Sequence, residues 1–297
     1  MVIVVKILNC GIVTILLLLH GLSLYILNFS KELNHSPFLV LALYVSLSDI
    51  TLGLEFLYHN VLRFMNSQSA PFQYQYMAIR YLTCGTYLWS LMQTLLICIE
   101  RLNAILITKK GILVYLTSNK CVVLCFILSL FIALLMFGVE TIGGPVQPDP
   151  KNTATPLIVF SFDILNLCIT VSIISVYVVV VNRIFHAQRN VQTSGLTASQ
   201  SAKKTRDTKK MRKNVITLGM IIALVLVAFL LRSFAVLYLY TVNEYEIDDI
   251  VFIICNNVFL LLNPLLDPVI YILRIKNFRD HLRCKCIRNN SVSHSNA

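Results

Sequence analysis

Seven long apolar stretches follow one another along the chain, with shorter polar connections between them. They cover residues 3–27, 38–62, 76–104, 121–143, 157–182, 214–240 and 248–273. Each is long enough to cross a bilayer as a helix, which takes about 20 mostly apolar residues. A helix satisfies its own backbone hydrogen bonds in lipid, and no stretch shows the alternation of a membrane-barrel strand. The pattern therefore predicts an all-α membrane protein, with a seven-transmembrane helix bundle over residues 1–273.

Composition and charge agree with a membrane location. Hydrophobic residues make up 57% of the 297 residues and charged residues only 13%, whereas a soluble domain has about 25% charged residues. Most of the 25 Lys and Arg residues lie in the first, third and fifth connections or after the last stretch. The positive-inside rule places those parts in the cytoplasm. We therefore expect a multi-pass plasma-membrane protein with an extracellular N-terminus, a cytoplasmic C-terminus and no nucleic-acid partner.

The two ends of the chain carry separate predictions. The first apolar stretch is expected to remain as a span, because it is long for a signal peptide and no small-residue cleavage site follows it. Residues 274–287 are predicted to form a short amphipathic helix on the membrane surface, followed by a short cytoplasmic tail over 288–297. Cys284 and Cys286 either carry palmitoyl groups or are unmodified thiols, and the sequence leaves both readings open.

Several polar residues lie where lipid is expected. Asp49 is halfway through the second stretch and Asp267 is deep in the seventh, while Ser90 and Asn263 are at similar depths. A charge at mid-membrane costs about 2.5–3.5 kcal/mol, so each acid is a candidate functional residue. An oxygen-rich group of this kind suits a small hard cation with bound water. The alternative is a pair of neutral, hydrogen-bonded acids that help the helices to pack.

The inner ends of the third and seventh stretches carry further candidates. Pro264 and Pro268 lie one helical turn apart and predict a bend, because proline removes a backbone hydrogen bond. Tyr271 follows one turn later. Glu100 and Arg101 close the third stretch on the cytoplasmic side. Taken alone, such a charged pair can simply anchor a helix at the membrane boundary.

These segments together resemble the rhodopsin-like G-protein-coupled receptors. The resemblance is carried by the second-helix segment SLSD at 46–49, by Glu100-Arg101-Leu102, by NPLLDPVIY at 263–271 and by IKNFR at 275–279. It implies a receptor that transmits the binding of an extracellular ligand to a heterotrimeric G protein. The residues matching the family's signalling switch are Glu100, Arg101, Tyr177, Phe229 and Tyr271. Those matching its allosteric sodium site are Asp49, Ser90, Asn263 and Asp267.

The same register implies an outer ligand cavity. Its residues are Glu55, His59, Arg80, Thr83, Tyr87, Arg232 and Asn257, with Cys84 and Asn256 beside them. Thr83 stands where amine receptors carry an aspartate, which favours a peptide or lipid ligand over a monoamine. Arg232 either binds a ligand carboxylate or phosphate, or pairs internally with Glu55 or Asp163.

The chain also departs from the family pattern. Gly21 replaces the first-helix asparagine, Tyr76 stands at the third-helix disulfide cysteine and Ile169 replaces the fifth-helix proline. Phe229 keeps an aromatic side chain in the sixth helix, but the proline after it is lost. The absence of both the third-helix cysteine and the fifth-helix proline is a feature in which the chain resembles the melanocortin, sphingolipid and cannabinoid receptor branch.

The sequence is compatible with three functional classes. The first is the G-protein-coupled receptor. The second is a receptor-like scaffold or decoy that no longer couples, which the lost proline and the missing disulfide would explain. The third is an ion-coupled membrane transporter, which the intramembrane acids would explain but the lack of an internal repeat does not favour. An enzyme is not expected, because no nucleophile–base pair, metal-ligand set or phosphate-binding loop occurs at a plausible spacing.

Overall fold

The computed structural model consists of helices throughout its described part. It describes residues 2–28, 37–65, 70–106, 111–143 and 156–192, together with residues 219, 223, 227, 261–262 and 264–268. Five of its helices are long and apolar enough to cross a membrane. They are α1 (Val2–Asn28), α2 (Pro37–Met65), α3 (Ala70–Ile105), α5 (Asn119–Gly143) and α6 (Pro156–Gln192). The described part of the chain is thus all-helical, as a multi-pass membrane protein requires, and each of the first five predicted spans is a helix of membrane-spanning length.

The helices differ from the predicted spans mainly at their ends. Helix α6 continues ten residues beyond the predicted span, because the polar segment up to Gln192 contains no glycine or proline that would end it. A short helix, α4 (Gly111–Leu116), follows α3 and was not predicted. In the sixth and seventh predicted spans the described positions are helical. The rest of those two spans, the predicted surface helix over 274–287 and the tail over 288–297 lie outside the described residues.

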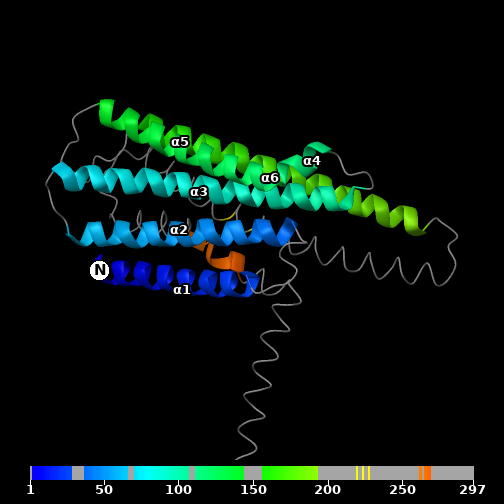
Figure 1. The fold of residues 1–297 in the computed structure, drawn as a ribbon, viewed down its shortest axis with the longest axis horizontal. Helices are drawn as coiled ribbons and strands as arrows, with labels where there is room; N and C mark the ends of the chain where they lie inside the picture. Colours follow the sequence, from blue (N-terminus) through cyan, green and yellow to red (C-terminus); the bar gives the residue numbers. More distant parts are fainter. Residues whose placement is uncertain are drawn as a thin grey trace, which may run out of the picture.

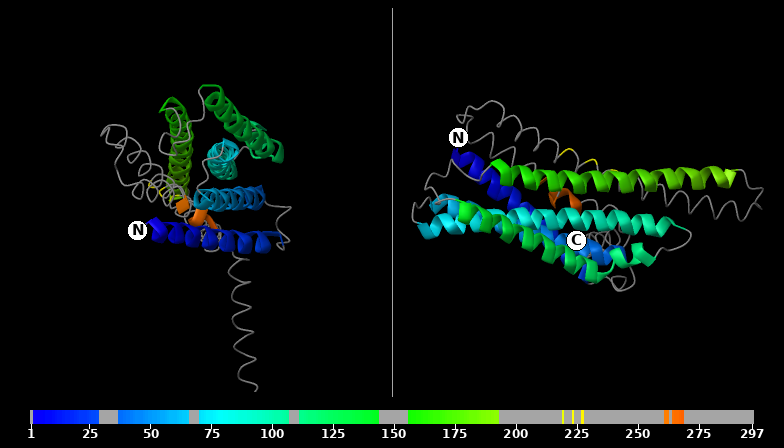
Figure 2. Two further views of the ribbon diagram at one scale, coloured as in Figure 1. Left: turned by 90° about the vertical axis from the view of Figure 1, so that its left-hand side faces the viewer. Right: turned by 90° about the horizontal axis from the view of Figure 1, so that it is seen from above.

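Consecutive long helices run in opposite directions, and α3 lies at the centre (Figure 1). Helix α3 packs against α2, α4, α5 and α6, while α1 packs against α2. The views from the end and from above show the same arrangement, with residues 261–268 beside α1 and α2 (Figure 2). Because the directions alternate, the C-terminal ends of α1, α3 and α6 lie toward one end of the bundle and those of α2 and α5 toward the other.

The surface of the described bundle is apolar, and polar residues are buried inside it. Helix α5 presents a broad apolar face, which includes Leu124, Ile127, Phe131, Leu134 and Ile142. The buried polar residues are contributed by α1, α2, α3, α5, α6 and the 264–268 segment, and include His20, Asp49, Glu55, Ser90, Gln93, Asn166 and Asp267. This distribution fits a protein whose outer solvent is lipid and whose polar groups must find partners within the bundle.

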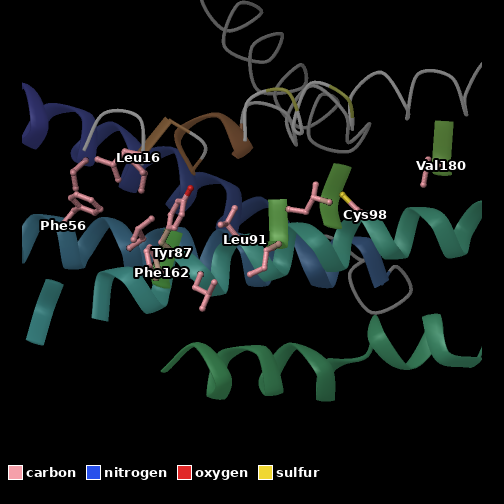
Figure 3. Packing of buried hydrophobic residues seen from close by; sticks show 13 residues of the cluster. Leu16, Phe56, Tyr87, Leu91, Cys98, Phe162 and Val180 are labelled. Carbon is pink, nitrogen blue, oxygen red and sulfur yellow. The ribbon is translucent and has the colours of Figure 1, made fainter. Parts of the chain in front are cut away.

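Apolar packing holds the helices at fixed separations. The largest buried cluster joins Leu16 of α1, Phe56 of α2, Tyr87 of α3 and Phe162 of α6 (Figure 3). Between α3 and α5 the contact is closer. A Cβ atom on Gly85 would lie 2.8 Å from the Cβ of Ala133 and 2.9 Å from the backbone oxygen of Ser129. Glycine is required here, because backbone on the opposing helix cannot move aside.

Candidate functional site

Asp49 and Ser90 form the centre of the candidate site. Asp49 is fully buried on α2, and Ser90 is almost fully buried on α3. The Ser90 hydroxyl donates a 2.7 Å hydrogen bond to Oδ1 of Asp49. This interhelical bond joins two residues that were predicted from the sequence to lie together, and it gives one carboxylate oxygen a fixed partner inside the membrane.

His20 of α1 is the third member of this centre and was not predicted. Its imidazole is fully buried, and Nε2 lies 2.6 Å from the backbone oxygen of Pro264. The same nitrogen lies 3.5 Å from Oδ2 of Asp49, which is too long for a strong hydrogen bond but close enough for electrostatic attraction. A carbonyl oxygen can only accept, so Nε2 must carry the proton. His20 therefore joins α1 to α2 and to the seventh predicted span.

The sequence explains why the Pro264 oxygen is available. In a helix this oxygen would accept a hydrogen bond from the backbone N–H four residues later. That residue is Pro268, which has no N–H. The proline pair therefore leaves a buried carbonyl without its helical donor, and the imidazole of His20 supplies one from another helix.

Asp267 lies next to this centre. Its side chain is 2% exposed, and it is close enough to Asp49 for the two carboxylates to interact electrostatically. The structure thus brings together three of the four residues expected at a sodium site: Asp49, Ser90 and Asp267. The fourth, Asn263, lies outside the described residues.

The described donors do not favour a sodium ion bound at Asp49. Oδ1 of Asp49 accepts from Ser90, and the N–H of His20 is directed at the oxygen of Pro264. Oδ2 of Asp49 has no hydrogen-bond partner among the described residues but lies 3.5 Å from the same nitrogen of His20. Among the described residues, no group of three or more His, Cys, Asp or Glu side chains is arranged to hold a metal ion. Sodium binding stays a prediction that comes from the family resemblance.

A second buried acid lies farther along α2. Glu55 is 7% exposed, and its Oε1 accepts a 2.8 Å hydrogen bond from the Thr86 hydroxyl of α3. Its other oxygen is buried and has no hydrogen-bond partner among the described residues. Since Glu55 was predicted to line a ligand cavity, this oxygen is the polar atom in that region with the clearest need for a cationic or N–H partner.

The other predicted cavity residues have varied environments. The His59 ring lies against the Tyr76 ring, with centroids 4.7 Å apart. Arg80 is half-buried, and Tyr87 belongs to the apolar core. Thr83 donates its hydroxyl proton to the backbone of its own helix. Arg232, Asn256 and Asn257 lie outside the described residues, so the structure does not show whether these side chains surround one cavity.

The predicted switch residues of α3 lie near its C-terminal end. Arg101 forms an ion pair with the adjacent Glu100, in which Nε and Oε2 are 3.2 Å apart. Its guanidinium also lies over the ring of Phe38 at the start of α2, 3.8 Å from the centroid. This stacking was not predicted. It holds the charged group against α2 and keeps it largely buried, with 18% of its side chain exposed.

The remaining predicted switch and tail residues are only partly described. Tyr177 is half-buried on α6, and its hydroxyl lies where a side chain on Gly219 would have to be. This places the Tyr177 side chain against the start of the sixth predicted span. Phe229, Tyr271 and the tail cysteines Cys284 and Cys286 lie outside the described residues.

In the first helix, His20 rather than Gly21 supplies the buried polar side chain near the position of the family's asparagine. Gly21 was expected at the position of the family's asparagine, but Gly21 is exposed and has open space around its Cα. The neighbouring His20 points into the polar centre instead. A single ionisable residue within the apolar run LLLLHGLSL was the signal available in the sequence.

The chain was also compared with known proteins. It matches no protein-family model and no curated protein sequence. The functional argument therefore depends on the residues and their geometry.

Proposed function

We propose that this protein is a seven-helix receptor of the G-protein-coupled type, which transmits the binding of an extracellular ligand to a heterotrimeric G protein. In this proposal the last two spans complete the bundle, the N-terminus lies outside the cell and the C-terminus in the cytoplasm. The basic connections face the cytoplasm, in agreement with the positive-inside rule. The ligand is a peptide or a lipid.

The observation that carries the proposal is the polar centre around Asp49. It links α1, α2 and α3 to the proline-containing segment 264–268 in the middle of the bundle. Buried polar groups are strained or released when helices move, so a centre shared by four elements couples their positions. Arg101 lies near the C-terminal end of α3, over Phe38 at the start of α2, and in the proposal this end of the bundle receives the cytoplasmic partner.

The test uses cells that express the full chain with a panel of G-protein dissociation sensors. Wild type is compared with Arg101→Ala and with Leu18→Ala, a change at an exposed apolar position of α1. We expect a basal or extract-evoked signal that Arg101→Ala abolishes at equal surface expression and that Leu18→Ala leaves unchanged. A wild-type signal that survives Arg101→Ala would overturn the proposal.

Two other functions predict different outcomes. A non-coupling scaffold would reach the surface and give no nucleotide exchange with any G protein, even with extracts that activate other receptors. An ion-coupled transporter would give a sodium or proton flux in proteoliposomes that Asp49→Asn abolishes. In a transporter, the side chains that carry the ion need access to water. Asp49 and His20 are instead fully buried.

A further inference from the structure

We propose that the imidazole N–H of His20 takes the place of a cation beside Asp49, so that the polar centre of this protein does not respond to sodium. The proposal does not depend on the proposed receptor function, because it concerns the internal chemistry of the bundle. It assigns His20 a positioning role that the sequence did not predict.

The first argument is that His20 already lies beside the oxygens that a sodium ion would need. A sodium ion at Asp49 would need oxygen ligands that point toward it. The oxygens at hand are Oδ2 of Asp49 and the backbone oxygen of Pro264, and Nε2 of His20 lies 3.5 Å from the first and 2.6 Å from the second. Nε2 lies close to both oxygens, and its proton is directed at the oxygen of Pro264. A metal ion bound to both oxygens would be repelled by the positive end of this N–H.

The second argument is that the surrounding packing confines the His20 side chain to its position. Its side chain is fully buried within α1, and the residues one turn away on the same face, Leu16 and Ser23, are also fully buried. The oxygen of Pro264 has lost its helical donor because Pro268 lacks an N–H. A sodium ion bound to this oxygen would displace the imidazole and leave the N–H of His20 without its acceptor in the interior. Entry of sodium would therefore break a hydrogen bond that nothing else in the described structure replaces.

The third argument is that the arrangement works with a neutral imidazole. The hydrogen bond to a carbonyl fixes the proton on Nε2, whatever the state of the other ring nitrogen. Oδ1 of Asp49 is held separately by Ser90 at 2.7 Å. The centre is thus organised by two fixed donors, one from α1 and one from α3.

The experiment uses the purified full-length protein in lipid nanodiscs at fixed pH. Unfolding midpoints and the fluorescence of Trp89, the one tryptophan of the chain, are measured in sodium chloride and in choline chloride at equal ionic strength. Trp89 is adjacent to Ser90 and lies edge-on against Phe126 of α5, with ring centroids 4.8 Å apart. It therefore reports on the helix that carries one of the two donors, without any G protein or ligand.

For wild type we expect the same midpoint and emission in both salts. His20→Ala should gain a saturable rise of a few degrees in midpoint with sodium but not with choline, and adding Asp49→Asn should remove that gain. His20→Gln should remain insensitive, because the glutamine amide can place an N–H near the position of Nε2.

A saturable sodium response in wild type that Asp49→Asn removes would overturn the proposal. So would a folded His20→Ala protein that shows no sodium response. If His20→Ala does not fold, the wild-type and His20→Gln measurements still decide, since a sodium response in either contradicts the proposal.

Discussion

Asp49 and Glu55 are two buried acids on the same helix, and their surroundings differ in one respect. Each accepts a short hydrogen bond from a hydroxyl of α3, Asp49 from Ser90 and Glu55 from Thr86. The second oxygen of Asp49 has no hydrogen-bond partner among the described residues, but it lies 3.5 Å from Nε2 of His20. The second oxygen of Glu55 is likewise without a hydrogen-bond partner among those residues, and no imidazole contact is shown beside it.

The difference separates two roles for buried carboxylates. Asp49 belongs to a centre whose donors come from other helices, which is what structural coupling between helices requires. Glu55 presents an oxygen that still needs a donor. That donor is supplied either by a ligand or by Arg232, which lies outside the described residues. Removing a partner of Asp49 should therefore lower the free energy of unfolding, whereas removing the charge of Glu55 should raise it.

The largest effect is expected from His20→Leu. This change leaves the buried oxygen of Pro264 without its hydrogen-bond donor, and an unsatisfied buried polar group typically costs about 2 kcal/mol. Unfolding of the purified protein in denaturant would measure the loss. Leu18→Ala, on an exposed position of the same helix, is the control and should have little effect. Equal stability of His20→Leu and wild type would contradict the assignment of His20 to the Asp49 centre.

The next effect is expected from Glu55→Gln, and it has the opposite sign. The amide still accepts from Thr86, while a buried charge with one unpartnered oxygen is removed, so the free energy of unfolding should rise by about 1 kcal/mol. If Arg232 is the internal partner of Glu55, the same change should instead destabilise the protein. A double-mutant cycle with Arg232→Gln distinguishes these cases, because it measures the interaction between the two residues.

Smaller effects are expected from the two hydroxyls of α3. Ser90→Ala and Thr86→Val each remove one interhelical hydrogen bond, and such bonds contribute about 0.6 kcal/mol on average within membranes. Both losses should exceed that of Thr170→Val, whose hydroxyl donates only to the backbone of its own helix. The comparison would fail if the Thr170 change proved as destabilising as the other two.

The smallest effect is expected from Phe38→Leu, at the start of α2. Stacking of a partly exposed arginine on an aromatic ring contributes about 0.5 kcal/mol, so releasing Arg101 should raise basal nucleotide exchange about twofold. Phe38→Tyr keeps a ring and should behave like wild type in the sensor assay. A combined Phe38→Leu and His20→Leu protein would show whether this contact acts independently of the Asp49 centre.

The sequence was sufficient for the features that depend on local pattern. Five apolar stretches correspond to five of the observed helices. Long apolar runs identify such helices because a helix that crosses the membrane must be as long as the bilayer is thick. The Asp49–Ser90 contact was also expected, since two polar side chains at one depth must find partners. By contrast, α4 was missed because six apolar residues between polar connections do not distinguish a short helix from a loop.

The features that were missed depend on contacts between distant parts of the chain. His20 alone could have been a core histidine with a partner in its own helix, and only the packing of α1 against the 264–268 segment shows its role. Phe38 looked like one more apolar residue at the start of a span, because nothing in its neighbourhood indicates that Arg101 lies over its ring.

The bond between His20 and Pro264 also has a consequence for biosynthesis, because its partners are 244 residues apart. At about 5–20 residues per second, a ribosome needs roughly 12–50 s to proceed from one to the other. During that time α1 and α2 can already lie side by side in the membrane, with Asp49 opposite His20 and no oxygen from the last span. The polar centre is thus completed only when the seventh segment arrives. We expect nascent chains that stop before it to retain a buried acid and an imidazole that quality-control factors can recognise.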